Sequence, residues 1–284
     1  MKPLDLDLPD LRLRLWDHGG DGRPVLFLHG FLDTGRSFDA VAAALPPEFR
    51  ALCLDFRGHG ASDRVPRSAS YHQLDHLKDL LQTLDHLAAQ DLAPAALVGY
   101  SMGGIIALLL AGTLPHLVER LLLVESLGAL PESPEGQVER LGRALERLRR
   151  PPSPFRSFAD PEAAIVRVLE NNPGLTRLGA ERMVRPVLRQ RQDGRWEFPL
   201  DPRLRGPSPI RFSEEFWLAL CGRVTARVEL LEGEFGLLPR FDGTEPRLAA
   251  FGNARKRRIA GAGHALHVDA PEEVAAGVSR LFET

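Results

Sequence analysis

A serine held between glycines is the residue best suited to nucleophilic chemistry. The stretch from Leu97 to Gly104 reads LVGYSMGG, with Ser101 between Gly99 and Gly103. If an apolar strand turns sharply into a helix here, the Ser101 hydroxyl is exposed at the tip, and larger side chains two positions away would collide. The hydroxyl then also lies at a helix N-terminus, where free backbone N–H groups favour negative charge. The pattern indicates a nucleophile for acyl transfer.

A serine hydroxyl needs a neighbouring base, and His264 is the best placed of the nine histidines. It ends the glycine-rich segment Gly261–His264, directly after the last predicted strand at Ile259-Ala260. A histidine far downstream of the nucleophile fits the chain order nucleophile, acid, histidine. His267 is the nearest rival, although it is less well placed in the loop.

Acyl transfer also needs donors for the oxyanion. The backbone N–H of Met102 follows the nucleophile, and the turn His29-Gly30-Phe31-Leu32 after a predicted strand supplies a second donor at Phe31. We expect His29 itself to brace the turn rather than to transfer protons.

The elements that must position these residues are strands alternating with helices. Continuous apolar runs predict central parallel strands, whereas Leu11, Leu13 and Leu15 alternate with arginines, as in a half-exposed edge strand. Ser70 begins a capping-box pattern that predicts a helix to about Ala89. The remaining predicted strands are Val25–Leu28, Ala51–Leu54, Ala95–Val98, Leu121–Val124 and Val228–Leu231. This alternation predicts a mostly parallel, doubly wound α/β sheet with catalytic residues at the carboxyl ends of its strands.

About a hundred residues separate Glu125 from the strand at Val228, too many for a single crossover. They include a proline-rich entry at 151–154, three helical segments and scattered aromatic residues. We interpret residues 130–222 as a helical cap, or lid, over a core formed by residues 1–129 and 223–284. Its aromatic side chains could line an apolar substrate pocket or simply join the cap to the core.

Composition excludes several partners. The chain has 284 residues, is 44% hydrophobic and carries a formal net charge of −2, as expected for a globular protein that binds no nucleic acid. Its one compact basic run, Arg255–Arg258, precedes a predicted strand and is interpreted as a solvated edge. Acidic residues near the N-terminus argue against a signal peptide, and the apolar stretch Ile105–Ala111 is too short to insert into a membrane. We therefore expect a cytoplasmic protein.

No motif indicates a metal or cofactor. Cys53 and Cys221 lack the spacing of a zinc or redox site and are interpreted as buried thiols. His72 and His76 have the spacing of metal ligands on a helix, but Leu74 and three further leucines mark a different face, so we expect both histidines to point to water.

The chain resembles the α/β-hydrolase superfamily over nearly its whole length. The motifs that carry this resemblance are HGFLD at 29–33, DFRGHGAS at 55–62, the Ser101 elbow and the His264 loop. Within the superfamily, HGFLD and the segment GAGHALHVDAPEEVA at 261–275 look most similar to the serine hydrolase-like proteins. The resemblance implies a capped hydrolase that uses a serine–histidine–acid triad without a cofactor.

The acid of that triad departs from the pattern. The family commonly places it in the loop after the strand at 228–231, where this chain has Gly236 in place of an aspartate. Some relatives supply it at the end of the strand after the elbow helix, where this chain has Glu125. We favour Glu125 over Glu234 and Asp242, and its alternative role is an ion pair with a cap arginine.

Two functional classes follow. The first is a serine hydrolase that cleaves a small ester-like substrate through an acyl-enzyme. The second is an inactive hydrolase fold that binds a ligand or partner, which the missing acid at position 236 would favour.

Overall fold

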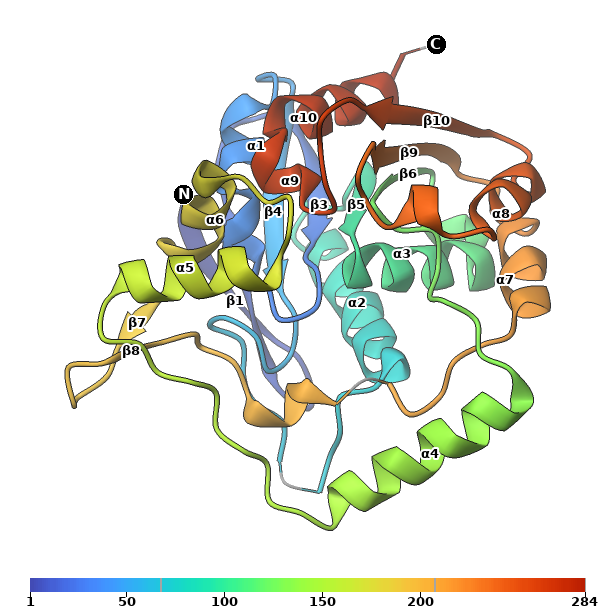
Figure 1. Ribbon diagram of the computed structural model, residues 1–284. Coiled ribbons are helices and arrows are strands. Elements are labelled where there is room, and N and C mark those ends of the chain that lie inside the picture. Colours follow the sequence, from blue (N-terminus) through green and yellow to red (C-terminus); the bar gives the residue numbers. More distant parts are fainter. Residues whose placement is uncertain (67, 207, 284) are drawn as a thin grey trace.

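The computed structural model describes residues 1–66, 68–206 and 208–283, and it is built around an eight-stranded sheet (Figure 1). The strands are β1 (Lys2–Asp7), β2 (Arg12–Asp17), β3 (Arg23–Leu28), β4 (Phe49–Asp55), β5 (Ala96–Tyr100), β6 (Arg120–Val124), β9 (Arg227–Gly233) and β10 (Ala254–Ile259). Their order is β1-β2-β4-β3-β5-β6-β9-β10, and every pair from β4 to β10 is parallel. The predicted mostly parallel sheet is confirmed.

The N-terminal strands differ from the prediction. β2 is not an edge strand, because β1 pairs with it on its outer side, and both neighbours of β2 run antiparallel to it. Leu13 and Leu15 are fully buried as a result. The strand at 2–7 was not predicted, although Leu4 and Leu6 alternate with Asp5 and Asp7, as in a strand with one buried face.

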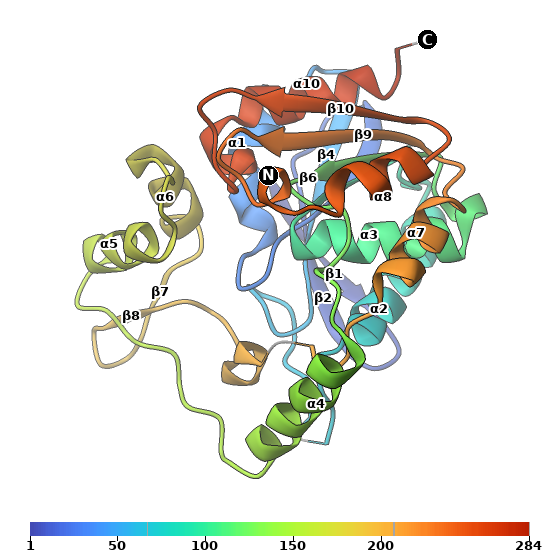
Figure 2. The same cartoon turned by 45° about the vertical axis from the view of Figure 1, so that its right-hand side comes forward.

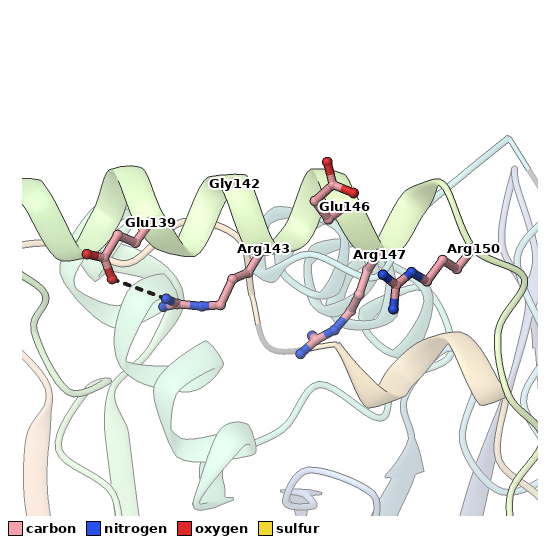
Figure 3. A pocket seen from close by; sticks show the side chains of 6 residues that line it. All are labelled: Glu139, Gly142, Arg143, Glu146, Arg147 and Arg150. Carbon is pink, nitrogen blue, oxygen red and sulfur yellow. Dashed lines mark hydrogen bonds and ion pairs between the residues drawn. The ribbon is translucent and has the colours of Figure 1, made fainter.

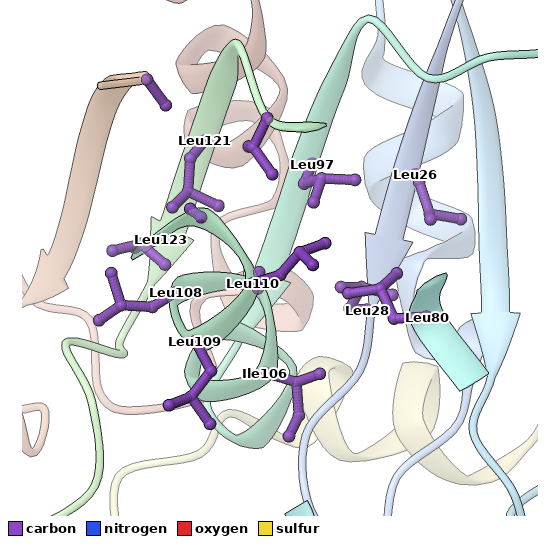
Figure 4. Close-up of a cluster of buried hydrophobic side chains, with 14 of the residues drawn as sticks. Leu26, Leu28, Leu80, Leu97, Ile106, Leu108, Leu109, Leu110, Leu121 and Leu123 are labelled. Atoms are coloured by element: carbon purple, nitrogen blue, oxygen red, sulfur yellow. The ribbon is translucent and has the colours of Figure 1, made fainter. Parts of the chain in front are cut away.

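The sheet buries side chains on both faces. Along β3, Leu26 and Leu28 belong to one apolar cluster, whereas Val25 and Phe27 belong to the other. Figure 4 shows the first cluster, where strand leucines meet Ile106, Leu109 and Leu110 of the elbow helix. Burying each such side chain contributes roughly 1.5–3 kcal/mol. The continuous apolar runs therefore form central strands covered on both sides.

Helices cover both faces, as Figures 1 and 2 show. One face carries α1 (Asp39–Ala44), α9 (Leu266–Asp269) and α10 (Pro271–Arg280), and the other carries α2 (Gln73–Ala88), α3 (Met102–Thr113), α7 (Glu214–Cys221) and α8 (Thr244–Ala250). The helix α3 is apolar on every side because it lies between the sheet, α2 and α7. None of the helices in the described ranges is long and apolar enough to cross a membrane.

The helix α2 corrects two expectations. It begins one residue after His72, which forms a capping box with Asp75, so Ser70 is not the cap. Its buried face also contains His76, only 4% exposed, while Leu74 is 75% exposed. His76 packs against the ring of Phe56 and does not point to water, whereas Leu77, Leu81 and Leu84 pack against the main core as expected.

Charge marks the opposite edge of the sheet. The last strand is longer than expected and contains the basic run, with Lys256 and Arg258 paired to the buried carboxylate of Glu232. These ion pairs occupy side chains that would otherwise be free to bind a polyanion. Charged residues on an edge strand also discourage pairing with another chain.

The segment from 130 to 222 crosses the carboxyl edge of the sheet. It contains α4 (Pro134–Leu148), α5 (Pro161–Asn171), α6 (Arg177–Val184), the hairpin β7 (Arg189–Gln190) and β8 (Trp196–Glu197), and η3 (Pro202–Arg205) before α7. A separate apolar cluster around Phe158 and Ile165 holds α5 and α6 together. The helix α7 packs on α3 and α8, and Trp217 and the buried thiol of Cys221 lie in the main core.

Hydrogen bonds tie this segment to the core at several places. Near α6, the Thr176 hydroxyl donates to Asp269 and Arg182 donates to the carbonyl of Val268, both on α9. Near η3, the Tyr71 hydroxyl donates to Asp201 at 2.8 Å. The segment is therefore fastened both beside the His264 loop and beside the β4–α2 loop.

Candidate active site

Ser101 lies at the tip of a strained turn between β5 and α3. Its backbone has a φ of +49°, in the region that L-residues rarely adopt. A Cβ on Gly103 would overlap the carbonyl oxygen of Leu28, so glycine is required there. The Ser101 carbonyl accepts from Ile105 N at 3.1 Å and from the Ser126 hydroxyl at 2.8 Å. Ser126, which no sequence pattern marked, supports the turn from just beyond β6.

His264 lies beside that hydroxyl. Its Nε2 is 3.1 Å from Ser101 Oγ, and its Nδ1 is 3.0 Å from Glu125 Oε2. A carboxylate only accepts hydrogen bonds, so Nδ1 carries the proton and Nε2 is free to accept from the serine. The imidazole is 28% exposed, whereas the Glu125 side chain is fully buried. The structure therefore brings together the three residues that the sequence analysis selected.

Glu125 is held from three directions. Its Oε1 accepts from Gly233 N at 2.7 Å, and its Oε2 accepts from Leu237 N at 2.8 Å as well as from His264. Its backbone φ is +49°, so the side chain leaves β6 at an unusual angle. A Cβ on Gly236 would overlap this carboxylate. The Glu125 carboxylate thus occupies the space that the side chain of an aspartate at position 236 would need.

The other candidates do not reach the imidazole. Glu234 accepts from Gly261 N at 2.8 Å at an exposed position. Asp242 makes no hydrogen bond or ion pair with any other described residue. His267 is fully buried, and its Nε2 lies 3.1 Å from Asp33 Oδ2 rather than near Ser101.

The loop after β3 passes directly beside the serine. An ideal Cβ on Gly30 would lie 3.5 Å from Ser101 Cβ and 2.7 Å from the ring of Tyr100, so the loop approaches as closely as glycine allows. Neither Phe31 N nor Met102 N donates a hydrogen bond to another described residue. Both amides are therefore available to a ligand at Ser101.

Buried histidines brace this region without facing Ser101. His29 donates from Nδ1 to the Gly30 carbonyl at 2.7 Å and accepts from Phe56 N at 3.0 Å. Burial lowers the pKa of His29, and it lowers that of His59 well below its usual value. These neutral rings hold the β3 and β4 loops together, which fits the expected bracing role of His29.

Asp55 ties the same loops from β4, a role that the sequence analysis did not identify. Its carboxylate accepts from Gly35 N at 2.7 Å, from Ala61 N at 2.9 Å and from Trp16 Nε1 at 3.1 Å. Burial raises the pKa of Asp55 despite these bonds. Its place at the start of DFRGHGAS was the available signal. Within the described ranges no three His, Cys, Asp or Glu side chains are arranged to hold a metal ion.

Residues 25–277 match the family described as the alpha/beta hydrolase family. The chain belongs to this family. A serine hydrolase-like protein from Danio rerio is 27% identical over 96% of this chain and 85% of its own length. A serine hydrolase-like protein from Dictyostelium discoideum is 26% identical over 79% of this chain and 63% of that protein. The resemblance to the superfamily and to this group is confirmed.

Solved structures agree with the family assignment. A hypothetical protein from Pseudomonas aeruginosa PAO1 has a TM-score of 0.87 and 30% identity, covering 99% of this chain and 98% of its own. The thioesterase domain from the curacin biosynthetic pathway has a TM-score of 0.81 and 25% identity, covering 100% and 99% of the two chains. The α/β-hydrolase fold thus extends over the whole chain.

Proposed function

We propose that this protein is a serine hydrolase that cleaves a carboxylic ester or related acyl substrate through an acyl-enzyme. The observation that carries the proposal is the pair of hydrogen-bonding distances joining Glu125, His264 and Ser101, at 3.0 and 3.1 Å. Relatives whose names include a thioesterase domain and a mouse sn-1-specific diacylglycerol lipase support acyl substrates.

The reaction proceeds in two halves. Ser101 Oγ attacks the substrate carbonyl carbon while His264 Nε2 takes the hydroxyl proton, and the oxyanion accepts from the N–H groups of Phe31 and Met102. The tetrahedral intermediate collapses as His264 returns the proton to the leaving oxygen or sulfur. Water then attacks the acyl-enzyme in the same manner and releases the acid. Throughout, Glu125 holds the imidazole tautomer and stabilises its charged form.

A fluorophosphonate probe tests the proposal, because it phosphonylates only an activated serine. We expect labelling of the wild-type protein and none of Ser101→Ala, and hydrolysis of p-nitrophenyl butyrate should disappear with it. Ser279→Ala serves as a matched control, since Ser279 lies on α10 and its hydroxyl makes no hydrogen bond with Ser101 or His264. An unlabelled wild-type protein would favour the inactive ligand-binding alternative instead.

A further inference from the structure

A cavity of about 610 Å³ begins beside the candidate site. Residues 31–34 of the loop after β3, which follow the close approach of Gly30 to Ser101, form one wall, and the rest comes from residues 155–158, the segments that contain α5 and α6, and residues 198–205. Its size falls within the range of pockets that enclose small molecules. The cavity is therefore positioned to receive the part of a substrate that extends away from the scissile bond.

Part of the lining is apolar. Phe158, Val168, Met183 and Phe198 contribute side chains from the cap, opposite Phe31 of the core. The flexible thioether of a methionine adapts to chains of different shape. This part suits a hydrocarbon chain.

The rest of the lining is basic. Three arginines, Arg156, Arg167 and Arg205, come from different cap segments and all are exposed. Arg167 bonds the exposed carboxylate of Glu170 at 2.9 Å. In the described part of the chain, no carboxylate lies within ion-pair distance of Arg156 or Arg205, and the Arg205 guanidinium lies 4.3 Å from the centre of the Phe155 ring.

The one acidic residue in the lining does not offset this charge locally. Asp33 is 6% exposed, and its Oδ2 accepts from the Ser37 hydroxyl at 2.8 Å and lies 3.1 Å from His267 Nε2. Its carboxylate therefore engages core groups rather than the arginines across the cavity. An apolar wall with unpaired guanidinium groups fits a ligand with a hydrocarbon chain and an anionic end.

We propose that the cavity binds acyl groups that carry a carboxylate at the end remote from the ester or thioester, so that the enzyme prefers half-esters of dicarboxylic acids. This rests on the proposed function, since it assigns the substrate class of the same serine. The guanidinium groups bind the remote carboxylate and take no part in bond making. Their effect falls on KM rather than on kcat.

The test compares p-nitrophenyl half-esters of suberic and sebacic acids with the same esters capped by a methyl group. The charged member of at least one pair should have about tenfold higher kcat/KM, since hydrogen bonds to charged groups are the stronger ones. In Arg156→Gln/Arg205→Gln this ratio should approach one, and 1 M NaCl should reduce it in the wild type.

Arg143→Gln is the matched control. Arg143 lies on α4 beside Glu139 in a hollow lined by Arg147 and Arg150, none of which borders the acyl cavity (Figure 3). The Arg143→Gln substitution removes one exposed guanidinium group and should leave the preference for the charged ester unchanged. Equal rates for charged and capped esters at both chain lengths would overturn the carboxylate subsite while leaving the hydrolase intact.

A binding measurement separates the two proposals. Monomethyl suberate and dimethyl suberate are titrated into Ser101→Ala by calorimetry, with and without the paired arginine substitutions. If the wild type hydrolyses no ester, the proposed function fails, and tighter, arginine-dependent binding of the charged compound still supports the subsite. Equal binding or no binding of the two compounds would overturn it.

Discussion

Replacing Glu125 by glutamine tests the assignment of the acid most directly. The carboxylate faces three donors, Gly233 N, Leu237 N and His264 Nδ1, at 2.7–3.0 Å. A glutamine has one accepting oxygen, so its NH₂ group must face at least one of these donors. In one orientation the NH₂ group faces the N–H of Gly233. In the other it faces the N–H of Leu237 and donates to His264 Nδ1, so that the imidazole proton must lie on Nε2. In both cases the charge that stabilises the imidazolium is lost.

The expected loss is large. A neutral amide in place of the triad acid costs about 10³–10⁴ in kcat, or roughly 4–5.5 kcal/mol of transition-state stabilisation. Turnover of p-nitrophenyl butyrate by purified Glu125→Gln measures it, with circular dichroism to verify folding. Glu232→Gln is the matched control, because Glu232 is equally buried on β9 but pairs with Arg258.

Two results would refute the reasoning. Glu125→Gln retaining more than a tenth of wild-type kcat would show that this carboxylate is not the acid. A comparable loss in Asp242→Asn would transfer the role to Asp242, which makes no bond within the described residues.

Three further predictions concern the same framework. Gly236→Asp alone should inactivate the enzyme by overlapping Glu125, whereas adding Glu125→Ser should restore at least about tenfold over Glu125→Ser alone, as p-nitrophenyl ester assays would reveal. Burial lowers the pKa of His76 to about 3 from 6.5, so the unfolded chain binds the extra proton in this range. The free energy of unfolding should fall as the pH drops below about 6.5, by up to about 1.4 kcal/mol per unit, and a urea midpoint unchanged between pH 7.5 and 5.0 would contradict this. Asp79→Asn should cost up to about 3–5 kcal/mol in urea unfolding, because the buried Arg57 loses its carboxylate partner at 2.6 Å and keeps only the longer contact with Asp75 at 3.6 Å; a loss below 1 kcal/mol would show that Asp75 or water replaces the carboxylate.

The elements of the core could be predicted because each shows one physical signal strongly. Central strands are apolar throughout. The sharp turn at Ser101 needs glycine at positions 99 and 103, because a Cβ there would overlap neighbouring backbone atoms. The approach of Glu125 to His264 was inferred from the family resemblance, because some relatives place the acid at the end of the strand after the elbow helix. That inference needed only the position of Glu125 at a strand end, not its side-chain geometry.

Other features depend on partners that a single segment does not reveal. The strand at 2–7 is charged and forms through pairing with β2. His76 is polar and yet buried, because Phe56 and the neighbouring loop enclose it. The cavity draws its walls from segments as distant as Phe31 and Arg205, whose proximity depends on how residues 130–222 pack against the rest of the chain. Periodicity cannot anticipate such meetings.

The bonds from α6 to α9 have a mechanical consequence. Asp269 and Val268, which hold Thr176 and Arg182, follow His264 by only a few residues. A movement of α6 away from the sheet would therefore also displace the loop that carries His264. Access to the cavity and the alignment of His264 with Ser101 are thus coupled, because a displacement of the His264 loop lengthens the 3.1 Å contact between the two side chains.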